Sequence, residues 1–189
     1  EIMVARFAMQ AGNIIGVGSF LPPYDKPDHE TGQSEHITPF WMLGGAGAEI
    51  EVDTETGRIR VTKLINVGDP GSAINPDIVE RQVVGAATMQ LGFTLFEEMI
   101  FNDGQVVNAS FADYKIPGML DLPDELTGEL VEVPDRNGPF GARGIGETGM
   151  FSVSPAIGNA LYDATGVRIM EMPLTPERVL RALRQAEGH

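Results

Sequence analysis

Cysteine is absent from this 189-residue sequence. The absence excludes a disulfide, a thiolate nucleophile and a cysteine-ligated iron–sulfur cluster within these residues. No run of about 18 apolar residues occurs either, and the first residues lack the basic-then-apolar pattern of a signal peptide. We therefore expect a cytoplasmic protein, and any redox relay must lie on another chain or segment.

Basic residues are scarce. Thirteen lysines and arginines stand against 27 aspartates and glutamates, which gives a formal net charge of -14. Such a charge repels nucleic acid and anionic membrane surfaces, so we exclude both as partners. A hydrophobic content of 42% is enough to bury a core and predicts one globular domain, built as one lobe or two. The sequence begins at Glu1 without methionine, which favours a piece of a longer protein.

Histidines are few, and two of the three lie in the polar, proline-rich segment 22–39. This segment has neither helical nor strand periodicity, so we predict a long connector loop. His29 and His36 are seven residues apart, a spacing that fits no compact metal motif. We interpret both as solvated loop residues.

Alternating apolar residues predict a β-hairpin in the segment AEIEVDTETGRIRVTKLINV. Residues 53–57 form its turn and contain Gly57. The predicted apolar positions are Ile50 and Val52 on the first strand, and Ile59, Val61, Ile65 and Val67 on the second.

A helix is predicted from about Pro76 to Phe96, with Asn75 as its N-cap and Pro76 at the first helical position. Gln82 lies beside the apolar stripe of this helix. Because a buried amide without partners costs about 1–3 kcal/mol, either the protein or a ligand must satisfy Gln82. The stripe consists of Val79, Val83, Ala86, Ala87 and Leu91.

Further elements complete the predicted fold. A second hairpin turns at Asp103 and Gly104, and a strand follows at 129–133. Ser154 is predicted to cap a helix that ends at Gly166, and a last helix begins at Thr175–Pro176. These patterns predict an α+β fold with mixed sheets and at least three helices packed on them.

The segment GPFGARGIGETGM contains too many glycines for a helix or a central strand, so residues 140–149 form a special loop. Glycines let a backbone approach a ligand closely, and successive amides can bind anionic oxygens. The spacing matches neither the Walker pattern nor a dinucleotide fingerprint. Glu147 is either a carboxylate that caps the loop or the working group of an active site.

Five segments together resemble the molybdenum hydroxylases, the xanthine dehydrogenase and aldehyde oxidase family. They follow one another in the order and with the spacing of that family's landmarks, from about residue 49 to 183. GPFGARGIGE resembles the segment that carries the family's active-site glutamate. The other four segments are VDTETGRIRV, DPGSAINPDIVERQVVG, FADYKIP and PLTPERVL.

The resemblance implies the C-terminal part of a molybdopterin-binding domain, with 22–39 as a connector and 140–149 as the active-site loop. Glu147 would be the base in a hydroxylation of a small-molecule carbon, with water as the oxygen source. The residues implied in cofactor binding are Gln82 as a partner of the pterin, Arg143, Gly144 and Gly146 in the loop, and Asn75 nearby.

The implied cofactor is molybdenum–molybdopterin, either as such or as its cytosine dinucleotide. Iron–sulfur clusters and FAD would lie on partner chains or segments, beside the remaining N-terminal part of the subunit. The sequence departs from the family pattern at Met89 and Gln90, where a second glutamine and a glycine are common, and at Arg143, where lysine is frequent.

Two other functions stay open from the sequence. The chain would be a structural or assembly lobe if its site were incomplete. A carboxylate-pair hydrolase would need a second acid that converges on Glu147, and the neighbouring sequence supplies none.

Overall fold

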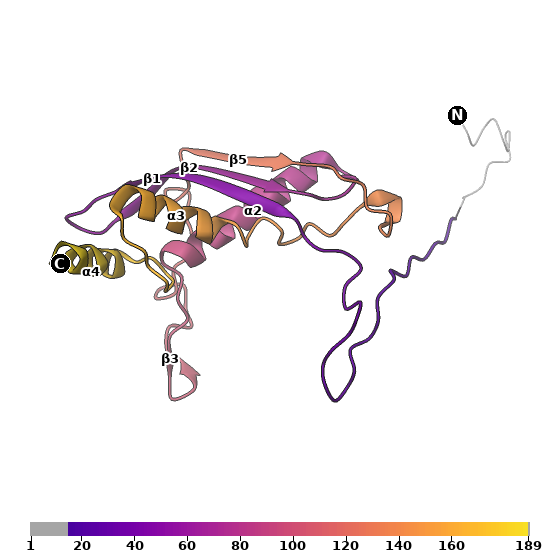
Figure 1. Cartoon of the computed structure of the whole chain (residues 1–189), viewed down its shortest axis with the longest axis horizontal. Helices are drawn as coiled ribbons and strands as arrows, with labels where there is room; N and C mark the ends of the chain where they lie inside the picture. Colours follow the sequence, from indigo (N-terminus) through magenta and orange to yellow (C-terminus); the bar gives the residue numbers. More distant parts are fainter. Residues whose placement is uncertain (1–14, 189) are drawn as a thin grey trace.

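The computed structural model describes residues 15–188. Its centre is a three-stranded mixed sheet of β1 (Gly44–Val52), β2 (Ile59–Gly68) and β5 (Glu125–Leu130), in the order β1-β2-β5. β1 and β2 are the antiparallel hairpin that the sequence predicts, and β5 runs parallel to β2. The predicted α+β class is confirmed, and β2 is the central strand (Figure 1).

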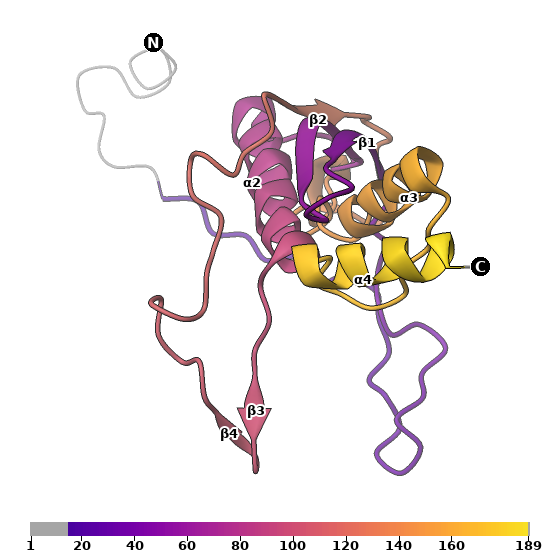
Figure 2. The same ribbon diagram turned by 90° about the vertical axis from the view of Figure 1, so that its left-hand side faces the viewer.

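Helices cover one face of this sheet. α3 (Val153–Thr165) packs beneath β1, and α2 (Pro76–Leu95) packs beneath β5 and β2. α4 (Pro176–Glu187) lies across the ends of these two helices (Figure 2). The predicted cap Asn75 is confirmed, since its Oδ1 atom accepts from Ile78 N at 3.2 Å. The last helix begins at Thr175–Pro176 as predicted, where the Thr175 side chain accepts from Arg178 N. No helix in residues 15–188 is long and apolar enough to cross a membrane.

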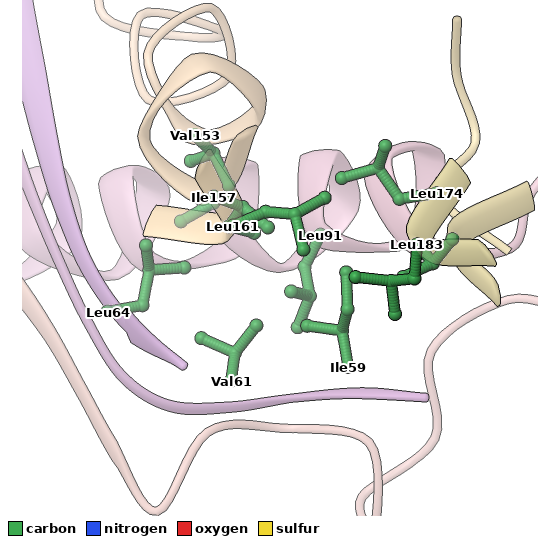
Figure 3. Close-up of a cluster of buried hydrophobic side chains, with 11 residues drawn as sticks. Ile59, Val61, Leu64, Leu91, Val153, Ile157, Leu161, Leu174 and Leu183 are labelled. Atoms are coloured by element: carbon green, nitrogen blue, oxygen red, sulfur yellow. The ribbon is translucent and has the colours of Figure 1, made fainter. Parts of the chain in front are cut away.

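The main hydrophobic core lies between the sheet and the helices (Figure 3). Each helix turns an apolar stripe toward the inner face of β2, as the helical period predicts. Burial of this apolar area is the main favourable contribution to folding. The core side chains labelled in Figure 3 are Ile59, Val61 and Leu64 of β2, Leu91 of α2, Val153, Ile157 and Leu161 of α3, and Leu174 and Leu183.

A β-bulge changes which residues of β2 face the core. Glu49 pairs with Lys63 whereas Ile50 pairs with Val61, so Thr62 is an extra residue on β2. The extra residue reverses the alternation, because side chains on a strand alternate between its two faces. The prediction that Ile65 lies on the same face as Ile59 and Val61 is therefore wrong. The inward residues beyond the bulge are Leu64, Asn66 and Gly68.

Two predicted boundaries are also corrected. The predicted strand at 129–133 lies earlier, as β5, because it pairs alongside β2 only until β2 ends at Gly68, opposite Leu130. α3 begins at Val153, with Ser152 rather than Ser154 in the cap position. The Ser154 hydroxyl is instead bonded to Gln90 Nε2 at 2.6 Å and to Thr94 Oγ1 at 2.7 Å. The predicted helix end at Gly166, with φ 72°, is confirmed.

Two segments project past the helices in the same direction (Figures 1 and 2). The first precedes β1 and contains the predicted connector 22–39, which has neither helix nor strand. The second carries the short hairpin of β3 (Phe101–Asn102) and β4 (Gln105–Val106), with its turn at Asp103 and Gly104 as predicted. Within residues 15–188, no group of three or more histidine and acidic side chains is arranged to hold a metal ion, so His29 and His36 belong to no such group.

Candidate active site

The glycine-rich loop is joined to the turn that follows β2. Gly71 and Ala142 form an isolated bridge, Ser72 N donates to Gly141 O at 2.8 Å, and Arg143 N donates to Pro70 O at 2.7 Å. The loop opens with a short 3₁₀ turn, η2 (Pro139–Gly141). These bonds bring residues 69–72, just before the helix α2, against residues that lie about seventy positions later in the sequence.

Arg143 connects the same two segments through its side chain. Its Nη1 atom lies 2.5 Å from Asp69 Oδ2, and its Nε atom lies 2.8 Å from Asp135 Oδ2. All three side chains are largely buried, so the guanidinium satisfies two carboxylates that would otherwise lack a counter-charge. Arg143 therefore fixes the path of the loop within the protein.

This ion-pair arrangement predicts a pH dependence. The hydrogen bond from Arg143, and then that from Asn137 N, lower the pKa of Asp135. A lowered pKa contributes stability above the unfolded value of about pH 4, and this contribution is lost as pH falls through the folded value. We expect Asp135→Asn to flatten the fall in unfolding free energy between about pH 5 and pH 3, measured by urea titration. An unchanged acid slope would contradict the pairing.

Gln82 holds the middle of the loop. Its Nε2 atom donates to Gly146 O at 2.7 Å, so the protein satisfies one amide proton of this side chain. Gln82 itself is exposed, and in the described part of the chain no hydrogen bond engages its carbonyl. Gly146 is exposed as well, and an added Cβ there would meet no atom within 4 Å.

The segment after Gly146 sits on a pair of glycines at the end of the hairpin. Gly44 of β1 pairs with Gly68 of β2. The Thr148 methyl would lie 3.5 Å from a Cβ at Gly44 and 3.7 Å from one at Gly68. These are ordinary contact distances, but a Cβ at Gly68 would lie 3.1 Å from Ile145 Cδ1, so this glycine leaves room for the loop to pack directly on the sheet. The Thr148 hydroxyl is buried and has no hydrogen-bond partner among residues 15–188.

Asn66 is a site residue that the sequence reasoning missed. Its fully buried amide donates from Nδ2 to Gly149 O at 2.6 Å and to Val83 O at 3.4 Å. Its Oδ1 atom accepts from Ser152 Oγ at 3.2 Å. The signal was a lone asparagine within an apolar strand, but uninterrupted alternation places that residue on the outer face.

Glu147 is exposed at the centre of this anchored loop. Its backbone oxygen accepts from Met150 N at 3.0 Å. Within residues 15–188, no hydrogen bond or ion pair engages its carboxylate, so the loop-capping interpretation has no support. The other two acids bonded to this loop, Asp69 and Asp135, are both engaged by Arg143.

A comparison with protein families matches residues 1–123 to the model described as "Molybdopterin cofactor-binding domain". The chain belongs to this family. The matched residues include Asn75 and Gln82, and they end before the loop that carries Glu147.

Individual relatives extend the similarity of this molybdopterin cofactor-binding chain. The probable hypoxanthine oxidase XdhD of Escherichia coli is 33% identical over 173 residues, 91% of this chain and 17% of the relative. The aldehyde oxidoreductase molybdenum-binding subunit PaoC of Escherichia coli is 37% identical over 143 residues, 75% of this chain and 20% of the relative. The chain thus spans about a fifth of the length of these relatives.

A solved structure shows the same fold. The aldehyde oxidoreductase from Desulfovibrio gigas superposes with a TM-score of 0.73 and 34% sequence identity, over 85% of this chain and 17% of that one. The fold described above is therefore also that of one part of this aldehyde oxidoreductase.

The exposed surface of the loop fits a large group such as molybdopterin. Gln82, Gly146 and Glu147 are exposed together, and the free space around Gly146 leaves its backbone accessible. Asn75 is also exposed and caps α2 beside the turn that anchors the loop. Gly144 lies against Phe40, whose ring would be 2.9 Å from an added Cβ. The side chain of Arg143, by contrast, is paired with the carboxylates of Asp69 and Asp135.

Proposed function

We propose that this chain is the C-terminal part of a molybdenum–pterin hydroxylase subunit, with Glu147 as its catalytic base. Its substrate is an aldehyde or a nitrogen heterocycle, the substrate types named for the relatives PaoC and XdhD. One observation carries the proposal: an exposed, unengaged carboxylate is held in a loop whose backbone is bonded on both sides of it.

The role of Glu147 is to accept a proton. When bound, the molybdenum–pterin group supplies the two-electron oxidant. Replacement of a substrate C–H by C–OH with water releases two protons and two electrons, and the Glu147 carboxylate takes the proton that leaves the attacking water oxygen. Proton transfer to a positioned carboxylate contributes about 10²–10⁴-fold to such rates. No second acid is required, which separates this chemistry from a carboxylate-pair hydrolase.

The neighbouring residues bind and orient. Gln82 fixes Gly146 and offers its carbonyl to the pterin, while the free space at Gly146 lets the cofactor approach the backbone. Gly144 contributes through its exposed backbone, since Phe40 occupies the place of its missing Cβ. Arg143 contributes through the loop path, because its side chain is engaged by two carboxylates. Asn75 acts as the cap of α2 at the border of the same surface.

The proposal includes partners beyond this chain. The rest of the molybdopterin-binding subunit covers the other side of the cofactor, which is molybdopterin or its cytosine dinucleotide. Electrons leave through iron–sulfur and FAD partners, since this chain contains no cysteine to ligate a cluster. The alternative is a structural lobe without catalytic function, and the unengaged Glu147 carboxylate favours the catalytic role.

Metal and pterin analysis of the natively purified assembly tests the cofactor. We expect molybdenum and pterin in equal amounts, measured by inductively coupled plasma mass spectrometry and by fluorescence of the oxidised pterin. An assembly that turns over without either would overturn the proposal.

Gln82→Ala is expected to weaken cofactor retention. The change removes a hydrogen bond to the loop and a proposed contact to the pterin, together about 1–2 kcal/mol or about 5- to 30-fold in affinity. Pterin content after dialysis measures this loss. Gln90→Ala is the matched control on the same helix, because its amide bonds Ser154 instead. Equal pterin retention in both variants would exclude the role of Gln82.

A further inference from the structure

Asn66 occupies an unusual position for a polar side chain. It lies on the central strand β2 and is fully buried, between Ala46 of β1 and Gly128 of β5. A buried amide must be hydrogen-bonded, and an apolar residue of similar size fills such a place without that requirement. The groups to which the Asn66 amide is hydrogen-bonded therefore indicate its role.

Each of those groups belongs to α2 or to the segment after Glu147. The amide nitrogen donates to Gly149 O at 2.6 Å and to Val83 O at 3.4 Å, and the amide oxygen accepts from Ser152 Oγ at 3.2 Å. One side chain thus ties the end of the loop to the sheet and to the helix that carries Gln82.

The two anchors lie on either side of Glu147. Gln82 bonds Gly146, the residue before Glu147, and Asn66 bonds Gly149, two residues after Glu147. Gly149 has no free space on the inner side, since an added Cβ would lie 2.7 Å from both Asn66 Nδ2 and Val83 O. The Gly149 backbone is therefore in direct contact with the Asn66 side chain, and loss of that side chain frees it to move.

We propose that Asn66 is a positioning residue for Glu147: its buried amide fixes the turn that presents the carboxylate. This inference rests on the proposed function of Glu147 as the base. Asn66 touches neither substrate nor cofactor and acts through the backbone of 147–150. Because a misplacement of about 1 Å lowers rates by about 100-fold, the anchor controls kcat.

The test compares two buried asparagines in the complete, cofactor-loaded assembly. Asn66→Ala removes the proposed anchor. Asn108→Ala is the matched control, because Asn108 is also buried and its amide also bonds backbone groups. Its Oδ1 atom accepts from Ile100 N at 2.9 Å, and its Nδ2 atom donates to Glu98 O at 2.7 Å. Asn108 follows β4, and its two partners precede β3, so its amide bonds no residue of the loop 140–149.

We expect Asn66→Ala to lower kcat by about 100-fold with KM unchanged. Hydrogen–deuterium exchange of residues 144–152 should become faster in that variant and stay unchanged in Asn108→Ala, which retains kcat. Ser152→Ala removes only the bond to Asn66 Oδ1 and serves if Asn66→Ala does not fold; a smaller change in the same two measurements is expected.

Equal kcat and equal loop exchange in the two asparagine variants would overturn the positioning role. Normal kcat in Asn66→Ala beside an inactive Glu147→Gln overturns the positioning role alone. Full turnover in Glu147→Gln instead overturns the proposed function, and with it the role of Asn66 in catalysis.

Discussion

Glu147→Gln is expected to lower turnover by at least about 100-fold while molybdenum and pterin contents stay near those of the unchanged assembly. The substitution keeps the size of the side chain and removes its ability to accept a proton. Because no hydrogen bond or ion pair in the described part of the chain uses this carboxylate, the loop itself should keep its structure. Steady-state kinetics with an aldehyde and a nitrogen heterocycle, together with metal analysis, measure both effects.

Glu129→Gln provides the matched control. Glu129 is an exposed glutamate on β5 and lies outside the loop, so its substitution makes the same change of charge and hydrogen bonding elsewhere on the surface. We expect full turnover in this variant. Retained turnover in Glu147→Gln would remove the assignment of the base, and lost molybdenum would show that the carboxylate supports cofactor binding instead.

Gly71→Ala is expected to destabilise the protein by about 3 kcal/mol. Gly71 has φ 68°, a left-handed conformation that costs a residue with a Cβ about 1–2 kcal/mol. The added Cβ would also lie 2.2 Å from Gly141 O, a backbone atom that cannot move away as a flexible side chain can. Such overpacking costs about 1–3 kcal/mol more. In a chain of this size the midpoint of thermal unfolding should fall by about 6–12 °C.

Gly85→Ala is the matched control for that result. Gly85 lies within α2, its φ is not positive, and an added Cβ there meets no atom within 4 Å. Alanine in place of glycine inside a helix should stabilise the protein by about 1 kcal/mol. Differential scanning calorimetry of the two variants should therefore give shifts of opposite sign. A drop of equal size in both would show that close packing at Gly71 is not the cause.

The elements with local signals could be predicted from the sequence. Asn75 caps its helix and the last helix begins at Thr175–Pro176 as predicted, because polar residue, proline and apolar period occur together within a few residues. The turn at Asp103 and Gly104 is set by the same kind of short-range chemistry. The glycine-rich loop was also recognisable, since so many glycines exclude regular structure.

The contacts that hold the loop could not be predicted, because they join residues far apart in the sequence. The side chain of Arg143, for example, is bonded to Asp69 and Asp135. Nothing in the local pattern indicates that pairing. The roles in catalysis and cofactor binding remain predictions for all six residues: Glu147, Gln82, Arg143, Gly144, Gly146 and Asn75.

The extra residue Thr62 on β2 decides which face of the sheet Asn66 occupies, although Thr62 itself does not touch the candidate site. If β1 and β2 paired regularly with Thr62 in place, Ile65 would face inward and Asn66 outward, as simple alternation requires. The inner face of β2 would still carry the apolar side chains of Ile59, Val61 and Ile65, so such pairing would satisfy the ordinary rules for folding. It would nonetheless remove the amide from beneath Gly149, so a single-residue insertion in β1 opposite Thr62, which restores regular pairing, is expected to give a folded variant with a loosened loop.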